Sequence, residues 1–126
     1  MIGHIHGFVA SDWVTAKTVA KAILVRRARR PGNPLISYSD LVAQLPLAID
    51  PSDPRLSLLL DEISVEEYSE GRGFLTVLVV HKHGDIKPGT GFYKMARKCG
   101  EEFDDEDAFH IRALEEVTRY WTGNEE

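Results

Sequence analysis

Long apolar runs are absent from this 126-residue chain, and cysteine is almost absent as well. No stretch approaches the ~20 consecutive apolar residues that a membrane-spanning helix needs, so we expect no membrane partner. The single cysteine, Cys99, excludes an internal disulfide and fits a reducing compartment. The first residues lack a basic segment followed by a long apolar one, which argues against a signal peptide. The sequence therefore predicts a cytoplasmic protein.

Acidic residues are missing from one stretch of the chain. Between Trp13 and Ser39 there are six basic residues and no acid, whereas from Asp40 onwards nineteen acids face nine bases. The net charge of −5 hides this asymmetry. Such a distribution is typical of a protein with one pole that faces a polyanion. It is equally explained by a basic helix end that lies over its own C-terminal dipole, so both interpretations stay open.

The length and the hydrophobic share of 43% fit one folded domain over residues 1–126, with no repeat and no linker. Ser11 and Asp12 offer N-cap oxygens to a helix that starts near Trp13. Prolines at positions 31 and 34 stop this helix, because proline removes a donor and disfavours helix in the preceding residue. The predicted buried stripe consists of Trp13, Ala16, Ala20, Ile23 and Leu24.

Two further helices are predicted before residue 70. Residues 37–40 (SYSD) form a capping-box-like start of a short helix that runs through Leu45. Asp53 followed by Pro54 is a typical N-cap with proline at the first helical position, so a third helix should run from about Arg55 to Ile63. Residues 64–67 (SVEE) form a second capping box, which predicts a fresh helical turn that ends at Ser69.

The second half of the chain predicts a hairpin and then helices. Residues 74–81 (FLTVLVVH) form a continuously apolar, β-branched strand, followed by a turn at residues 83–85 and a return strand from Ile86. A short helix over residues 92–99 and an amphipathic helix over residues 108–121 come last. This order predicts an α+β fold of the winged helix-turn-helix type, with a small antiparallel β-hairpin and a C-terminal helix.

Residues 36–42 (ISYSDLV) resemble the start of the helix pair in the winged-helix domain of alkyltransferase-like DNA-repair proteins. The resemblance covers roughly residues 34 to 92 and implies a fold only. The proline-cysteine-histidine-arginine active site of that family has no counterpart in residues 74–78, and Cys99 lies elsewhere. Residues 71–100 are also similar to a signature of small uncharacterised bacterial winged-helix-like proteins, to which no activity is attached.

Candidate metal and catalytic groups are few. His81 and His83, with Asp85 nearby, have the spacing of metal ligands, as do His4 and His6, but no third ligand follows locally. A polar hairpin tip explains the first pair equally well. Cys99 lies next to basic residues but at the end of a predicted helix, where the dipole disfavours a thiolate. We therefore predict no catalytic residue, no metal and no cofactor.

Two local patterns leave a functional and a structural interpretation open. Residues 89–91 (GTG) open a helix and have the backbone for a phosphate contact, although a tight turn needs the same residues. Arg72 lies between two glycines, where it can reach a phosphate or a carboxylate. Its structural alternative is an ion pair with Glu67 or Glu70.

The favoured hypothesis is a non-enzymatic module that binds nucleic acid, DNA in particular, through phosphate contacts. The helix expected to enter a DNA groove carries Asp61 and Glu62, so binding would use other surfaces. The alternative is a protein-interaction or accessory module, a homodimer included, with Tyr120 and Trp121 as a contact surface. The predicted nucleic-acid contacts are Arg26, Arg27, Arg29, Arg30, Arg72, Lys82, Lys87, Lys94, Arg97 and Lys98.

Overall fold

The computed structural model describes residues 3–82, 84 and 86–123 of the chain. Over these residues the fold is α+β, with five α-helices and two sheets of two strands each. Within the described residues, none of the helices combines the length and the apolar character that a bilayer span requires. The elements in chain order are β1 (His4–Ile5), β2 (Phe8–Val9), α1 (Ala10–Arg29), β3 (Ile36–Ser37), α2 (Tyr38–Val42), α3 (Pro54–Ser69), the 3₁₀ helix η1 (Leu75–Leu78), β4 (Val79–Val80), α4 (Thr90–Lys98) and α5 (Glu106–Gly123).

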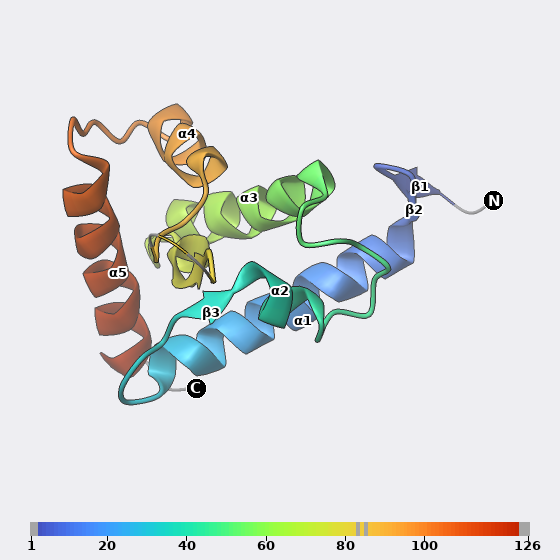
Figure 1. Ribbon diagram of the computed structural model, residues 1–126, viewed down its shortest axis with the longest axis horizontal. Coiled ribbons are helices and arrows are strands. Elements are labelled where there is room, and N and C mark those ends of the chain that lie inside the picture. Colours follow the sequence, from blue (N-terminus) through green and yellow to red (C-terminus); the bar gives the residue numbers. More distant parts are fainter. Residues whose placement is uncertain (1–2, 83, 85, 124–126) are drawn as a thin grey trace.

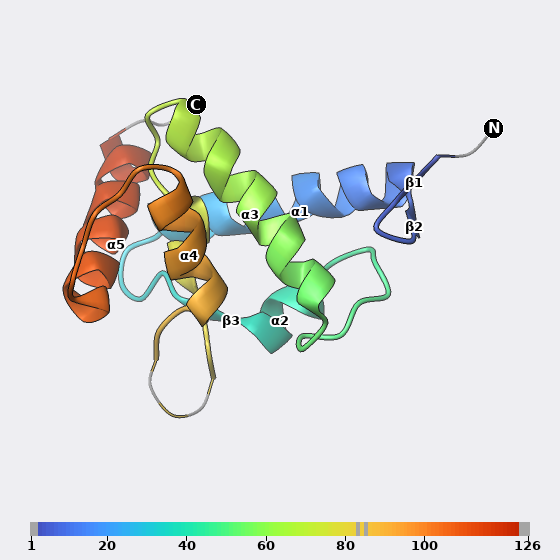
Figure 2. The same cartoon turned by 90° about the horizontal axis from the view of Figure 1, so that it is seen from above.

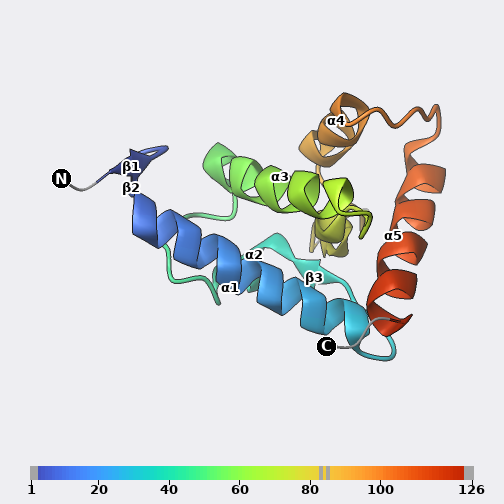
Figure 3. The same cartoon turned by 180° about the vertical axis from the view of Figure 1, so that it is seen from behind.

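Three long helices frame the molecule. Helices α1 and α3 lie side by side, and α5 closes the end at which α1 finishes (Figure 1). The opposite end carries the hairpin β1–β2, which pairs antiparallel (Figure 1). Helix η1 contacts all three long helices and so occupies the centre of the fold. Viewed from behind, the C-terminal end of α1 lies next to that of α5 (Figure 3).

The predicted starts of α2 and α3 are confirmed by their caps. The side chain of Ser37 accepts a hydrogen bond from the backbone N–H of Asp40, and Asp53 accepts one from the N–H of Arg55. Pro54 occupies the first turn of α3, as expected from its fixed φ. The stripe predicted for α1 is buried as well.

Helix α3 is continuous through residue 64, where the sequence predicts a new start. Ser64 is fully buried, and its hydroxyl bonds to that of Thr76 in η1. Ser64 also accepts a hydrogen bond from the backbone N–H of Thr76 at 3.1 Å. The Ser64 oxygen therefore bonds to Thr76 and not to a backbone N–H at a new helix start. The capping-box interpretation of residues 64–67 is wrong for this reason.

The segment predicted as a buried strand, residues 74–81, is buried but is mostly not a strand. Residues 74–80 are all buried, yet they form the 3₁₀ helix η1 followed by the two-residue strand β4. A short apolar run does not distinguish a strand from a buried helical turn. The antiparallel hairpin of this protein is β1–β2, and among the described residues no strand follows Val80. The predicted turn residues His83 and Asp85 lie outside the described residues.

Strand β4 pairs in parallel with β3, so that Ile36 faces Val79 and Ser37 faces Val80. Two parallel strands end at the same edge of their sheet. The residues that follow them, Tyr38 after β3 and His81 after β4, therefore lie together, and their rings are 5.1 Å apart. This short ladder positions one of the two candidate sites described below.

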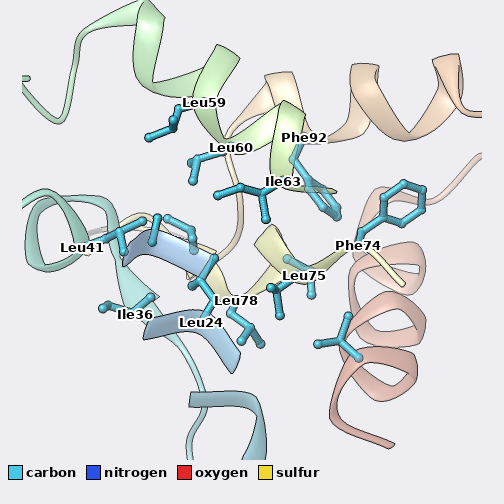
Figure 4. Close-up of a cluster of buried hydrophobic side chains, with 14 of the residues drawn as sticks. Leu24, Ile36, Leu41, Leu59, Leu60, Ile63, Phe74, Leu75, Leu78 and Phe92 are labelled. Atoms are coloured by element: carbon cyan, nitrogen blue, oxygen red, sulfur yellow. The ribbon is translucent and has the colours of Figure 1, made fainter. Parts of the chain in front are cut away.

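The core gathers side chains from α1, α2, α3, η1, α4 and α5. In the close-up of Figure 4, Leu24 of α1 and Ile36 and Leu41 from the β3–α2 segment lie across from the α3 leucines and from η1. Phe74 joins this cluster to Phe92 and Phe109, with ring centroids 6.0 and 6.2 Å away. Burying this much apolar surface is the main favourable contribution to folding.

Candidate functional site

The C-terminal end of α1 carries a continuous basic surface, which we call the arginine pole: Arg26, Arg27, Arg29, Arg30 and Arg119. Arg26, Arg27 and Arg30 line one shallow hollow beside β3. Arg26 and Arg29 line a second hollow, and Arg30 and Arg119 line a third. Neighbouring hollows share Arg26 or Arg30, so the five arginine side chains line adjoining parts of the surface.

Most of the arginine pole is free of carboxylate partners. Within the described part of the chain, Arg26, Arg30 and Arg119 form no ion pair, and all three side chains are exposed. The guanidinium of Arg27 donates to the carbonyl oxygens of Pro34 and Leu35, so the backbone already engages two of its nitrogen atoms.

Two residues of α5 modify this surface. Arg29 lies over the ring of Trp121, 5.1 Å from its centroid. Trp121 is buried, so the prediction that it forms a partner surface is not supported by its position. Glu115 lines the third hollow together with Arg30 and Arg119, and it is the one acid in the three hollows among the described residues. The described part of the pole therefore carries an excess of positive charge.

The other predicted contacts lie elsewhere, and several face carboxylates. Lys82 pairs with Asp40 at 3.9 Å. Lys87 pairs with Asp107 at 4.0 Å, and Arg97 pairs with Glu106 at 3.8 Å. Lys94 and Lys98 are exposed on α4. The structure therefore brings together the four predicted arginines of α1 but places these five cations around α4.

Arg72 forms the ion pair that the sequence left as its structural alternative. Its guanidinium donates to the Oε2 atom of Glu67, whose side chain is only 1% exposed. Lys21 reaches the same oxygen at 3.4 Å. Glu67 holds the pKa of Arg72 above its usual value through this hydrogen bond. A side chain engaged in this way is not presented to an external phosphate.

The starts of α2, α3 and α4 lie near one another (Figure 2). Residues from these three segments line a cavity of about 530 Å3. Its walls include apolar side chains from α3 and α4, among them Leu56, Leu60 and Phe92. Its polar lining comes from Tyr38, Ser39, Ser52, Asp53, Ser57, Asp61, Thr76, His81, Lys82 and Thr90. The size and the mixture of apolar walls with a set of polar groups are typical of ligand sites.

Tyr38, His81 and Gly89 form one wall of the cavity. The backbone N–H of Gly89 donates to the hydroxyl oxygen of Tyr38 at 2.9 Å. The Tyr38 hydroxyl accepts there, so its own proton is free for an acceptor in the cavity. A Cβ atom added to Gly89 would lie 3.3 Å from this hydroxyl and 3.5 Å from the Nε2 atom of His81. Glycine therefore keeps the space beside both groups open.

Asp61 on α3 is the acidic group of the cavity whose protonation is most strongly altered. Burial raises its pKa to about 6, and the positive charge of Lys98 partly opposes this shift. Asp53, the other acid of the lining, is engaged by Arg55, whose guanidinium donates to both of its oxygens. The charge of the cavity therefore depends on Asp61, His81 and Lys82.

Cys99 and the His4–His6 pair lie within the described residues, whereas His83 of the second histidine pair does not. Burial raises the pKa of the Cys99 thiol, and Asp61 and Glu101 add to the effect, which keeps the thiol protonated. Within residues 3–82, 84 and 86–123, no group of three or more His, Cys, Asp or Glu side chains is placed to hold a metal ion. His83 and Asp85, from the predicted metal pair, lie outside this range.

Two features were missed in the sequence. Arg119 joins the arginine pole only because α5 ends beside the end of α1, and no local signal connects these segments. The cavity residues Tyr38, Asp61 and His81 come from three elements. The parallel pairing of β3 with β4, which brings two of them together, has no signature in two-residue strands.

Comparisons of the chain with protein-family profiles, with curated proteins and with solved structures gave no significant match. The sites are therefore interpreted from their geometry and charge.

Proposed function

We propose that this protein is a non-enzymatic module that binds nucleic acid through its phosphates, with the arginine pole as the contact surface. The observation that supports this most directly is the convergence of Arg26, Arg27 and Arg30 with Arg119 from a distant helix. Guanidinium groups bind phosphate oxygens in a bidentate manner and remain charged at all relevant pH values. Phosphate contacts provide affinity without requiring a base-reading helix.

The winged helix-turn-helix assignment belongs to the same proposal. Helices α2 and α3 follow each other as the helix pair of such a fold does, although residues 43–53 make a longer connection than the usual turn. The antiparallel hairpin, β1–β2, precedes this pair instead of following it as a wing would. Helix α3 carries Asp61, Glu62 and Glu66 towards solvent or the cavity, which is unfavourable next to DNA. We therefore assign the contacts to the end of α1 and not to α3.

The test is fluorescence anisotropy with a labelled short DNA duplex at low salt. The affinity of the natural chain should fall linearly with salt on logarithmic axes, with a slope of roughly −4 if about four phosphates are neutralised. The variant R26Q/R30Q/R119Q should lose most of the binding and should show a slope reduced by roughly three units. The three side chains are exposed, so circular dichroism should show an unchanged fold.

The matched control is K87Q/K94Q/K98Q, which removes the same number of charges from the α4 side and also lowers the net charge of −5 by three. It should bind nearly as well as the natural chain. If both variants lose binding equally, affinity follows net charge alone and the assignment to the arginine pole is wrong. Absence of binding at low salt, for duplex and single strand alike, would refute the function itself.

The alternative function, a protein-interaction module, is supported by a different surface. Leu58 and Val65 are exposed by 41% and 45% on α3, and they line a shallow hollow with His6. Residues seven apart lie on the same face of a helix, so the two side chains form one apolar strip. Multi-angle light scattering would test a homodimer: L58S/V65S should convert a dimer to a monomer, and a natural chain that is already monomeric excludes this form of the proposal.

A further inference from the structure

The cavity between α2, α3 and α4 is separate from the arginine pole and is not explained by the function proposed above. No residue of the pole lines it. Its donors come from the ends of two parallel strands, because Tyr38 follows β3 and His81 and Lys82 follow β4. In α/β folds the carboxyl ends of parallel strands are a common location of ligand sites.

The available donors indicate the chemistry of a ligand. The bond with Gly89 does not use the hydroxyl proton of Tyr38, and His81 adds a ring N–H. Lys82 adds an ammonium group; its ion pair with Asp40, at 3.9 Å, is exposed on both sides and therefore weak, so a phosphate can replace it. Thr90 contributes a hydroxyl to the same lining. A phosphate monoester accepts several hydrogen bonds on three oxygens and carries the opposite charge to Lys82. A carboxylate offers fewer acceptor positions for the same set of donors.

We propose that this cavity binds a terminal phosphate monoester, with Tyr38, His81 and Lys82 contacting the phosphate oxygens. Gly89 keeps the space beside Tyr38 and His81 free for the oxygens. The apolar walls formed by Leu56, Leu60 and Phe92 receive the group that the phosphate esterifies. Both a small phosphorylated metabolite and the phosphorylated end of a nucleic-acid strand present this chemistry.

Asp61 sets the charge balance of the site. It lies on the α3 wall, it is half-buried, and its carboxylate repels an anion when it is ionised. The groups that face it are Lys98 and Cys99 at the end of α4, Tyr38 from α2, His6 from the β1–β2 turn, and Glu62 and Glu66 from its own helix. The isosteric change Asp61→Asn removes the repulsion, so it should strengthen phosphate binding by about five-fold at pH 7.5.

The first experiment compares adenosine monophosphate, adenosine and inorganic phosphate with the full chain by isothermal calorimetry and by ¹H–¹⁵N correlation spectra. The monophosphate should bind at least ten-fold more tightly than adenosine, since a charge-assisted hydrogen bond is worth about a factor of ten or more. Shifts of backbone signals should centre on residues 81 and 89–91. Equal binding of adenosine and its monophosphate, or shifts confined to the arginine pole, would overturn the proposal.

A second comparison identifies the source of the phosphate. A short oligonucleotide is used with a 5′-phosphate and with a 5′-hydroxyl group. Preference for the phosphorylated strand, with no binding of the monophosphate, assigns the site to strand ends, whereas binding of the monophosphate assigns it to small ligands. Both outcomes support phosphate recognition. If neither the monophosphate nor the phosphorylated end is preferred over its dephosphorylated counterpart, the proposal fails.

Variants separate this site from the pole. Y38F/K82Q should weaken monophosphate binding at least ten-fold, whereas R26Q/R30Q/R119Q should leave it unchanged. Gly89→Ala tests the space directly, because its Cβ would lie 3.3 Å from the Tyr38 hydroxyl, and Gly89 has a φ of −69° that alanine adopts readily. Gly123→Ala is the control, since this residue lies in α5 outside the cavity and its Cβ would meet nothing within 4 Å. Loss of binding in the pole variant but not in the cavity variants would refute the site while leaving the proposed nucleic-acid function intact.

Discussion

The cations of the arginine pole and the cations around α4 differ in what surrounds them. At the pole, Arg26, Arg30 and Arg119 are exposed and form no ion pair among the described residues. Around α4, Lys87 and Arg97 each have a carboxylate at 4.0 Å or less. The sequence predicted phosphate contacts in both regions, but the fold places carboxylates beside the cations in only one of these two sets.

The difference is due to the segment that follows α4. Residues 101–107 contain six acids, and the chain passes from α4 to α5 through them, which places Glu106 and Asp107 next to Arg97 and Lys87. The end of α1 is followed instead by residues 30–36, which contain no acid. A basic cluster in a sequence is therefore informative about binding only when the acids that approach it in the fold are also known.

The largest loss of stability is expected where cations are paired with a buried carboxylate. Glu67 is buried and contacts both Arg72 and Lys21, so Glu67→Gln leaves two cations without their carboxylate. Removing one member of a buried ion pair is strongly destabilising, and we expect a loss of about 2–4 kcal/mol in the free energy of unfolding. Urea denaturation measures this directly.

The control for this substitution is Glu66→Gln on the same helix. Glu66 pairs with Lys17 at 2.8 Å but is 61% exposed at its side chain, so the expected loss is below about 1 kcal/mol. Equal losses in the two variants would show that burial does not distinguish the two pairs, and the comparison drawn here would fail.

Two arginines of the pole should differ by a smaller amount in their contribution to the free energy of unfolding. Arg29 lies over the ring of buried Trp121, and its aliphatic stem packs in the hollow beside α5. We expect Arg29→Ala to lower the unfolding free energy by about 1–2 kcal/mol, through lost cation–π contact and packing. Arg30→Ala should change it by less than about 0.5 kcal/mol. If thermal unfolding shows the reverse order, Arg30 has a structural role and the pole is not free.

The smallest effect on stability is expected for Asp61 of α3, which forms no ion pair among the described residues. Burial raises the pKa of Asp61 from 3.8 to about 6, so the folded state holds a proton that the unfolded state releases earlier. Asp61 therefore favours the folded state below pH 3.8, and this contribution is lost as the pH rises through about 6. Because the residue is only half-buried, we expect the natural chain to lose about 1 kcal/mol relative to Asp61→Asn over this range.

The measurement is urea denaturation of the natural chain and Asp61→Asn at pH 4.5 and pH 7.5. Carbon-detected titration of the Asp61 carboxyl supplies an independent readout, with a midpoint near pH 6. A midpoint near 4 would mean that the carboxyl is fully solvated, and it would also remove the argument that Asp61 opposes anion binding.

Local sequence predicted several helix boundaries. The stop before Pro31, the cap at Ser37 and the Asp53–Pro54 start all depend on interactions within a few residues. The start of α1 was predicted wrongly, because the helix begins at Ala10 and neither Ser11 nor Asp12 caps it. The buried stripe of α1 was predicted correctly, because spacing alone determines which side chains share a helix face.

The interactions that could not be predicted connect distant segments. Ser64 has the local sequence of a helix cap, but its hydroxyl bonds to Thr76, twelve residues further along the chain. Residues 74–80 were predicted as a strand because apolar side chains suit any buried conformation. In the fold, their contacts with α1, α3 and α5 favour the 3₁₀ helix η1 over most of this segment. For the sites, the four α1 arginines were foreseen, whereas Arg119 and the cavity follow from the packing of α5 and the pairing of β3 with β4.

The parallel contact between β3 and β4 also constrains when the cavity forms during folding. Ile36 faces Val79, so their pairing closes a loop of 43 positions, from 36 to 79. Closing a long loop has an entropic cost that must be met before the contact contributes stability. The cavity therefore exists only once this long loop has closed, and a chain that ends before Val79 lacks β4 and with it the His81 side of the cavity.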